Sequence, residues 1–264
     1  MKYRIFREIN AGAAIAARDV LILLKTPSYF IFSLIMPLIF MGILGGSLAQ
    51  NMSAGLPYDY GQFLLVGMLV NMLLMGTTGG ITSLVEDRTE DFTQELMVSP
   101  ISRYTIIIGK IFGSSFSALL QLLGTLFTAF IMGIHYSPWQ LMAVLAAAPL
   151  ICLSAGALGM IIVAFIKDNR TAGMVQMLVV MPQMFLTGAF IPINNSRGFL
   201  LVLSRLMPMT YCLDLARAAF FAGTPGYAAI VLFNPAFNIL IIVALTAVFL
   251  FIGTFFFVRS ETNR

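Results

Sequence analysis

The sequence predicts an all-α membrane protein that crosses the bilayer several times. Charged residues make up 10% of the 264 residues and apolar residues 59%, whereas about a quarter of the residues of a soluble domain are charged. Six apolar runs reach the roughly 20 residues that a helix needs to span a bilayer. A soluble fold would leave much of this apolar surface in water, so the composition argues against an ordinary soluble domain.

The predicted spans share an absence of Asp and Glu. In chain order they are Tyr29–Ala49, Gly61–Val85, Thr105–Gly133, Leu141–Ile166, Thr171–Ile191 and Pro235–Val258. Ion-coupled transporters use titratable or ion-binding groups at membrane depth. If this protein moves a cargo uphill, the energy is therefore expected to come from outside the membrane.

The distribution of basic residues predicts the orientation. Of the 15 Lys and Arg residues, all except Arg197, Arg205 and Arg217 lie on one side, in the N-terminal stretch, the loops after the second and fourth spans with the adjoining helix ends, or the tail. The positive-inside rule then places both termini in the cytoplasm. The net charge of +4 reflects this topology and does not indicate nucleic-acid binding.

Residues 1–27 are expected to form an amphipathic helix on the cytoplasmic membrane surface. Its apolar stripe consists of Ile5, Ile9, Ala13, Ala16, Val20 and Leu24. The basic residues of this stretch can lie among lipid head groups. The transmembrane domain would then occupy residues 28–258, followed by a cytoplasmic tail at 259–264.

The second predicted span, Gly61–Val85, is followed by an acidic block at residues 86–98. As a helix it presents Val85, Thr89, Phe92 and Leu96 on one face. Its charged positions are Glu86, Asp87, Arg88, Glu90, Asp91 and Glu95. The cytoplasmic leaflet is negatively charged, so an acidic amphipathic helix is expected to bind a protein in preference to lipid. A solvated connector is the alternative.

Polar side chains inside the spans mark a candidate cargo path. The candidates are Asn71, Gln121, Gln176 and Gln183, with the pliable thioethers Met177 and Met181 on the fifth span. Interhelical hydrogen bonding, at about 0.6 kcal/mol per bond, is the competing interpretation. The glycine pairs Gly76/Gly80 and Gly109/Gly113 have the spacing that allows close helix packing.

The predicted outer segment, residues 192–234, is mostly apolar but carries charges. Prolines divide it into short helices at about 195–206 and 210–221. A re-entrant hairpin is favoured over a seventh span, because a charge at a helix centre costs about 2.5–3.5 kcal/mol. We expect Asp214 and Arg217 to pair on one helix. The candidate outer gate is Pro208, Tyr211, Asp214 and Arg217, and a lid that only packs a dimer is the alternative.

Three stretches resemble the ABC-2 class of permeases in order and spacing. They are "VEDRTEDFTQELMVSPISRYTIIIGKI", "MFLTGAFIPINN" and "LMPMTYCLDLAR". The opening "RDVLILLKTPSYF" is similar to drug-exporter permeases of the daunorubicin type. One departure is the absence of a glycine in "EDRTEDFT", where the family pattern has one, which leaves the detailed docking geometry open.

The resemblance implies a permease subunit that pairs with itself or a sibling and with two cytoplasmic ATPases. The chain has no phosphate-binding loop, because Gly109–Lys110 is followed by Ile111; ATP and Mg2+ would therefore bind the partner, and no cofactor, metal or catalytic residue is expected here. Residues Glu86–Leu96 would be the coupling helix that contacts the ATPase. The implied location is the cytoplasmic membrane of a prokaryote.

The cargo and two other classes of function stay open. An amphiphilic drug or lipid-like molecule is expected, and a lipid-linked glycan or polysaccharide is the alternative. An intramembrane lipid-modifying enzyme would need a cluster of acids, His or metal ligands at one membrane face, and His135, the single histidine, lies in an outer loop. A membrane scaffold is the third class.

Overall fold

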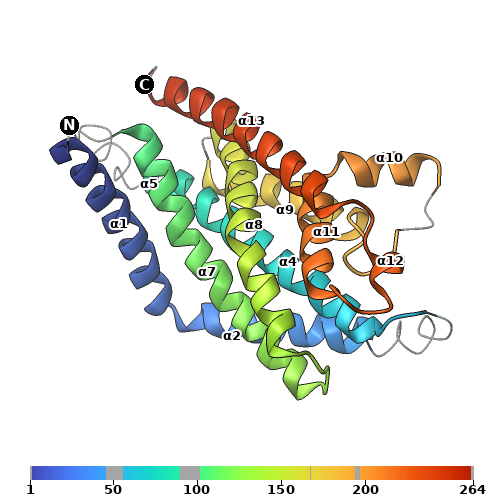
Figure 1. Ribbon diagram of the computed structural model, residues 1–264. Helices are drawn as coiled ribbons and strands as arrows, with labels where there is room; N and C mark the ends of the chain where they lie inside the picture. The colour runs from blue at the N-terminus through green and yellow to red at the C-terminus, as the bar shows by residue number, and fades with distance from the viewer. Residues whose placement is uncertain (1, 46–55, 90–101, 167, 194–196, 263–264) are drawn as a thin grey trace.

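The computed structural model describes residues 2–45, 56–89, 102–166, 168–193 and 197–262, and within these ranges its regular elements are all helices (Figure 1). They are α1 (Lys2–Leu24), α2 (Pro27–Phe40), the π-helical turn η1 (Met41–Gly45), α4 (Tyr60–Thr82), α5 (Leu84–Thr89), α7 (Arg103–Ile131), α8 (Pro138–Phe165), α9 (Asn169–Leu186), α10 (Phe199–Leu206), α11 (Pro208–Phe220), α12 (Tyr227–Ile230) and α13 (Pro235–Thr262). The predicted all-α class is confirmed for this part of the chain.

Four of the six predicted spans coincide with helices that are long and apolar enough to cross a membrane. These are Tyr60–Asp87, Tyr104–Ile131, Pro138–Phe165 and Tyr227–Phe257. The helices α10 and α11 meet at an angle of 82°, and they add a fifth span only if the bent pair is counted as one. The structure thus shows a multi-pass arrangement of four or five candidate spans.

The other two predicted spans correspond to shorter helices. α2 and η1 end at Gly45, and the last residues of the predicted first span lie outside the described residues. α9 has 18 residues and carries Gln176 and Gln183 in its apolar sequence. Neither helix is among those long and apolar enough to span by themselves, so six spans stay a prediction.

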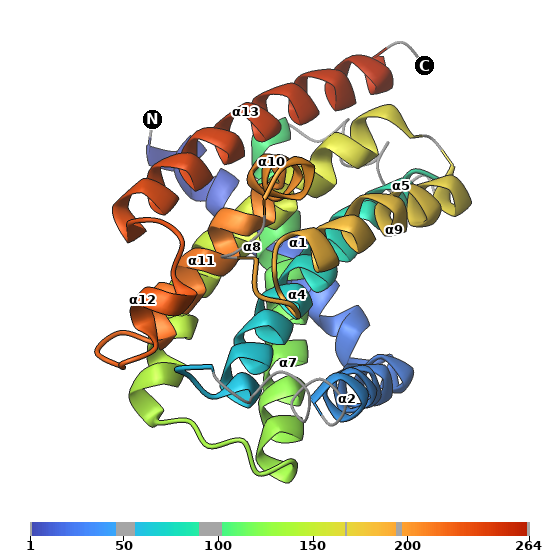
Figure 2. The ribbon, with the colours of Figure 1, turned by 90° about the vertical axis from the view of Figure 1, so that its right-hand side faces the viewer.

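α4 is the central helix of the bundle. Most of its side chains are buried, and it packs against α7, α8, α9 and α11 (Figure 2). A Cβ atom on Gly80 would lie 2.2 Å from Cβ of Ser114, and one on Gly76 would lie 2.8 Å from Cα of Ala118. The glycine pair therefore allows α4 and α7 to touch, as its spacing predicts.

α1 lies along α7, and glycines again set the distance. A Cβ on Gly109 would lie 2.8 Å from the carbonyl oxygen of Gly12. Ile15 and Leu23 are the buried apolar residues among the described side chains of α1. Two residues of the predicted apolar stripe, Ile9 and Leu24, are 62% and 53% exposed, whereas a third, Ala16, lies against Gly113 of α7. The expected contact of the stripe with the membrane stays a prediction.

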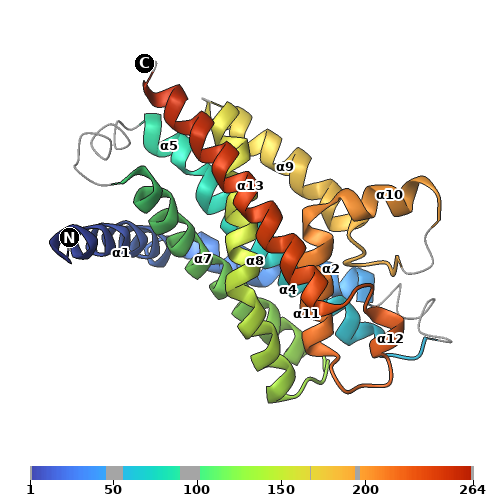
Figure 3. The same cartoon turned by 45° about the horizontal axis from the view of Figure 1, so that its top comes forward.

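Different helices lie at the two ends of the bundle. The amino-terminal part of α1, α5 and the carboxyl-terminal part of α13 gather at one end, whereas α10 and α12 lie toward the other (Figure 3). α5 leads into the acidic block, so the block starts at the end of the molecule that also holds both termini. This end would be the cytoplasmic one in the predicted orientation.

Candidate functional site

Four charged side chains from three helices form a closed ring at the end of the bundle that holds the termini. Lys110 of α7 places Nζ 3.0 Å from Oδ1 of Asp19 and 2.8 Å from Oδ2 of Asp87. Arg18 places Nη2 2.9 Å from Oδ1 of Asp87 and Nη1 3.6 Å from Oδ1 of Asp19. Cations and anions alternate around this charged ring, so its charges balance.

The charged ring is largely removed from water. The side chains of Lys110, Asp87 and Asp19 are 4%, 9% and 11% exposed, and that of Arg18 is 30% exposed. Burial raises the pKa of Asp19, and the neighbouring Lys110 ammonium opposes this shift. Removing one partner from a buried ion pair costs about 3–5 kcal/mol, because the other charge stays buried without compensation.

Small residues bring the ring members together. A Cβ on Gly113 would lie 2.9 Å from Cβ of Asp19, so the glycine lets α1 come close enough for Asp19 to reach Lys110. On another face of α7, Gly80 brings in α4, whose continuation into α5 carries Asp87. Helix packing at glycines thus determines which charges meet.

α1 also caps the start of α7. The backbone N–H of Ser102 donates to both carboxylate oxygens of Glu8, at 2.9 and 3.1 Å, and the Thr105 hydroxyl donates to Oε2 of Glu8 at 2.6 Å. The first N–H groups of a helix have no partner within the helix, and a carboxylate there also favours the helix dipole. Glu8 is therefore a capping residue supplied by a different helix.

The structure describes some of the predicted coupling residues, and those it describes differ in burial. Glu86 is exposed, whereas Asp87 points into the bundle as a ring member. The backbone of Arg88 belongs to α5. Glu90, Asp91, Phe92, Glu95 and Leu96 lie outside the described residues.

Sequence reasoning grouped Asp87 with the outward-facing charges and did not single out Arg18, Asp19 or Glu8. A signal for the ring was present in Lys110, the one basic residue within the predicted spans, because a buried ammonium needs a counter-ion. The identity of that counter-ion could not be read from the sequence, since Asp19 is 91 positions away.

The amides of Gln176 and Gln183 in the candidate cargo path bond to other helices, whereas the amide of Asn71 bonds within its own helix, α4. Oε1 of Gln176 accepts from the Thr82 hydroxyl at 2.7 Å, which joins α9 to α4. Oε1 of Gln183 accepts from the backbone N–H of Met209 at 3.4 Å, and Nδ2 of Asn71 donates to the Gly67 carbonyl at 3.2 Å. The space beside Asn71 and Gln183 measures about 10 Å³, which is no more than one water needs.

The other residues of the candidate cargo path, Met177, Met181 and Gln121, are more exposed than Asn71 and Gln183. Met177 and Met181 are 59% and 50% exposed on the outer face of α9, and Gln121 of α7 is half-buried. The buried amides and the exposed thioethers therefore do not line one cavity in this single chain. Interhelical hydrogen bonding accounts for Gln176 and Gln183 but not for Asn71, whose amide bonds within α4, and it leaves the Met face available.

The predicted pairing of Asp214 with Arg217 is wrong. Asp214 accepts hydrogen bonds from the backbone N–H groups of Leu232 and Phe233, at 2.7 and 2.9 Å, and from Nδ2 of Asn238 at 2.8 Å. These hydrogen bonds stabilise the charged form of the carboxylate. Asp214 is 1% exposed.

Arg217 instead binds the turn that follows α9. Its Nη2 donates to the carbonyls of Gly188 at 2.7 Å and Ala189 at 3.4 Å, and its guanidinium carbon lies 3.8 Å from the centre of the Phe63 ring. The guanidinium thus supplies a donor to two carbonyls of the turn after the helix and lies over an aromatic ring. The stretches "MFLTGAFIPINN" and "LMPMTYCLDLAR" consequently touch each other. Of the other gate candidates, Pro208 starts α11, and the Tyr211 hydroxyl donates to the Arg205 carbonyl at 2.9 Å.

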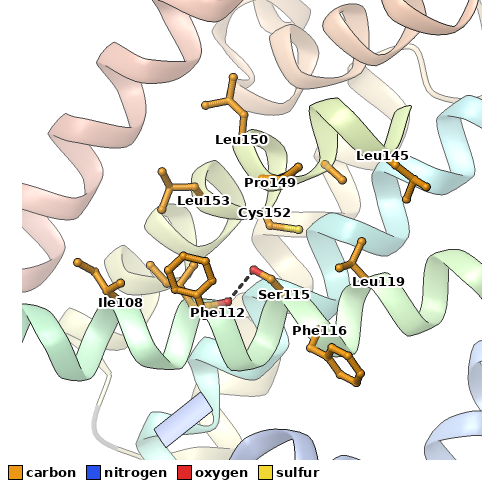
Figure 4. A pocket seen from close by; sticks show the side chains of 12 residues that line it. Ile108, Phe112, Ser115, Phe116, Leu119, Leu145, Pro149, Leu150, Cys152 and Leu153 are labelled. Atoms are coloured by element: carbon orange, nitrogen blue, oxygen red, sulfur yellow. Dashed lines mark hydrogen bonds between the residues drawn. The ribbon is translucent and has the colours of Figure 1, made fainter. Parts of the chain in front are cut away.

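An apolar groove of about 670 Å³ lies between α7 and α8 (Figure 4). Its lining includes Ile108, Phe112, Phe116, Leu145, Pro149 and Leu153. The Ser115 hydroxyl in this groove is already used, since it donates to the Ile111 carbonyl at 2.6 Å. No candidate cargo residue contributes to the lining, and the groove suits an alkyl chain.

Comparison with known proteins gives a consistent assignment. The model of the family "ABC-2 type transporter" matches residues 11–221. Nodulation protein J of Rhizobium meliloti (strain 1021) is 25% identical over 186 residues, which cover 69% of this chain and 70% of that protein. The putative transport permease ycf38 of Cyanophora paradoxa is 24% identical over 73% of this chain and 68% of its own length. Nodulation protein J of Neorhizobium galegae is 23% identical, with shares of 73% and 74%.

Proposed function

This chain belongs to the ABC-2 type transporter family, and on that premise we propose that it is the membrane-spanning subunit of an ATP-driven exporter. Family membership makes it a transport permease and not an enzyme, so the lipid-modifying alternative is set aside. Permeases of this family generally work with ATPase subunits.

The charged ring carries the mechanical part of the proposal. The ATPase would bind residues 86–98, and the ring fixes the start of this segment to two helices through Asp87. A push on the segment would then move the bundle instead of bending a loose connector. Two permease chains, each with an ATPase subunit, would rock between inward-open and outward-open states. Both termini would face the cytoplasm of a prokaryotic cell.

The exposed surface of α9 and the apolar groove support an amphiphilic cargo. Met177 and Met181 are available to a second permease chain or to cargo, and thioethers adapt to varied shapes. The groove between α7 and α8 offers apolar lining without a charged group. A drug or lipid-like molecule fits these surfaces, and a lipid-linked glycan is the second candidate, since only its lipid part would need them.

The outer gate would be built on α11. Arg217 and Asp214 connect α11 to the turn that follows α9 and to the loop before α13. Release of cargo would require these helices to separate from the same elements in a second chain. Tyr211 and Pro208, at the start of α11, would form the mobile edge of this gate.

The coupling assignment is tested by adding charge to the predicted ATPase-facing stripe. The double variant Phe92→Asp/Leu96→Asp should lose both the co-purifying ATPase and ATP-dependent efflux, because two carboxylates would enter an apolar contact. Phe199→Asp is the matched control: Phe199 is 77% exposed on α10, away from the end that holds the termini. Wild-type ATPase binding and efflux in the double variant would contradict the assignment.

The cargo is tested by mass spectrometry of small molecules that co-purify with the complex in lipid nanodiscs. A drug-like or phospholipid species that is released on ATP addition supports the first candidate. A glycan attached to a lipid carrier would support the second.

A further inference from the structure

The apolar groove between α7 and α8 has a counterpart on the other side of α7. A second hollow, of about 400 Å³, lies between α1 and α7. Ile108 and Phe112 line both spaces, and across the groove they lie opposite Leu153 of α8 (Figure 4). The Phe112 side chain is 68% exposed. The two spaces therefore run side by side along α7, and Ile108 and Phe112 separate them.

Both spaces are apolar along most of their length. None of the residues that line the groove is charged, and its one hydroxyl, that of Ser115, already donates to the Ile111 carbonyl at 2.6 Å. The polar side chains of the hollow beside α1 are Glu8 and Thr105, which bond to each other at 2.6 Å. A polar ligand would find few partners in these spaces, whereas alkyl chains need none.

The polar and apolar parts of this surface are ordered as in one leaflet of a bilayer. Glu8 and Thr105 lie near the start of α7, at the end of the bundle that holds the termini. The lining then continues along α7 to Leu119. From Thr105 to Leu119 the helical rise gives about 21 Å, and half of a bilayer core is about 15 Å thick. The lining thus extends from a polar boundary across about one leaflet.

The charge of α1 favours a phosphate group at the polar boundary. The first two turns of α1 carry Lys2, Arg4 and Arg7 beside Glu8. The Glu8 carboxylate already accepts from Thr105, and the three cations make this stretch net positive. Basic residues next to a membrane attract the phosphates of lipid head groups. A phospholipid therefore matches both the charge at this end and the apolar lining beyond it.

We propose that the two spaces form a binding site for one diacyl phospholipid of the cytoplasmic leaflet, with one acyl chain on each side of Ile108 and Phe112. Its phosphate would lie at the basic start of α1. The inference goes beyond the proposed function, because the lipid would bind the permease without ATPase or ATP. In the groove between α7 and α8 it names a ligand class where the proposed function needs only an amphiphile.

Packing explains why this lipid would stay bound while its neighbours exchange. Lipid tails are as apolar as side chains, so apolar character alone gives no preference for the protein surface. The gap is fixed by α4, against which α7 and α8 both pack closely while they touch each other little. It cannot close unless one of these helices leaves α4. An acyl chain that fills the gap restores close contacts that an unfilled space would lose.

Two matched pairs of variants test where the lipid binds. Ala13 and Ala14 are adjacent and exposed on α1, but of the two only Ala13 lines the hollow. Ile108 and Ile131 are 46% and 58% exposed on α7, and of these only Ile108 lines the two spaces. Ala13→Trp and Ile108→Trp would each fill part of the site. Ala14→Trp and Ile131→Trp add the same ring outside the site and control for effects on folding.

The measurement is native mass spectrometry of the whole permease chain, purified without ATPase and titrated in detergent with dioleoyl phosphatidylglycerol. Wild type should bind one lipid per chain. Ala13→Trp and Ile108→Trp should weaken this binding about fivefold or more, because overpacking opposes entry of the lipid. The two control variants should bind as wild type does. Single-chain oleoyl lysophosphatidylglycerol should bind wild type about fivefold more weakly than the two-chain lipid, since one space stays unfilled.

Equal lipid binding by Ala13→Trp and Ala14→Trp would overturn the inference, and so would equal binding of the two lipids by wild type. The comparison of the two lipids needs no variant, so it holds even if a tryptophan prevents folding. Dissociation of a permease dimer in Ala13→Trp or Ile108→Trp, with lipid binding unchanged, would also overturn it, because a second copy would then occupy the spaces. Failure of the proposed function would leave these results unchanged, since no step uses ATP.

Discussion

Charges are buried at both ends of the bundle, but they are compensated in different ways. In the charged ring, Lys110 and Arg18 pair with the carboxylates of Asp19 and Asp87. At α11, Asp214 binds mainly backbone N–H groups, and Arg217 binds backbone carbonyls and an aromatic ring. The first arrangement matches charge with charge, and the second matches charge with the dipoles of a fixed backbone.

The difference determines what each region can tolerate. Charge balance in the ring can be restored by changing a second side chain, because every partner is a side chain. The partners of Arg217 are carbonyls of Gly188 and Ala189, and no substitution can remove them. We therefore expect the charged ring to tolerate substitutions that remove one cation and one anion together. We expect the α11 contacts not to tolerate the loss of Arg217, whatever second substitution is made.

The largest loss is expected for Arg217→Met. It leaves two buried carbonyls without their donor and should lower the free energy of unfolding by about 3–5 kcal/mol. Adding Asp214→Asn should give no recovery, because the carbonyls stay unsatisfied. Thermal unfolding of both variants in detergent measures this. A double variant that regained wild-type stability would show that the two charges compensate each other after all.

The next largest effect is expected in the charged ring. Lys110→Met leaves two carboxylates facing a single Arg18 and should cost about 3 kcal/mol. Adding Asp19→Asn should recover most of this loss, since one cation then faces one anion. The same unfolding measurement applies. If adding Asp19→Asn to Lys110→Met lowered the stability further, charge balance would not be what stabilises the ring.

Two glycines provide a smaller and more direct comparison. A Cβ on Gly67 would lie 2.1 Å from the carbonyl oxygen of Ala189, whereas a Cβ on Gly113 would lie 2.9 Å from the Asp19 side chain. Overpacking costs about 1–3 kcal/mol, and we expect Gly67→Ala near the top of this range and Gly113→Ala near the bottom. Similar melting temperatures for the two variants would argue that the α11 region adapts as readily as the ring.

The smallest effects should appear as pH dependence. Burial raises the pKa of Asp19 above its ordinary value of 3.8, while hydrogen bonds from the hydroxyl and backbone N–H of Thr171 lower the pKa of Asp168 below 3.8. A raised pKa means that the folded state binds the proton more tightly, so the Asp19 contribution to stability falls as pH rises from 3.8 through the raised value. The Asp168 contribution is present above 3.8 and is lost as pH falls through the lowered value.

These opposite slopes can be separated by substitution. Asp19→Asn should remove the decrease in stability with rising pH, and Asp168→Asn should remove the increase. Melting temperatures between about pH 3 and pH 6 measure both contributions. Identical pH profiles for wild type and Asp19→Asn would show that Asp19 keeps its ordinary pKa.

Much of the architecture could be predicted from local pattern. The apolar runs around α4, α7, α8 and α13 predicted four helices with nearly correct ends, because helix length and hydropathy are properties of consecutive residues. The pairs Gly76/Gly80 and Gly109/Gly113 predicted close packing, which the structure shows against α7 and α1. The sequence pattern did not predict which face of α1 packs against α7, because it marked only an apolar stripe expected to face the membrane.

By itself, the sequence determined an all-helical membrane permease with a polar segment between its second and third long helical regions and family motifs in a fixed order. Only the tertiary structure decided that Asp87 faces inward to Lys110, that α1 supplies Glu8 and Arg18 to both ends of the polar segment, and that Arg217 binds carbonyls and not Asp214. The reason is physical. Hydropathy and periodicity act along the chain, whereas a charge takes its partner from whichever helices touch, and small residues such as Gly80 and Gly113 decide that contact.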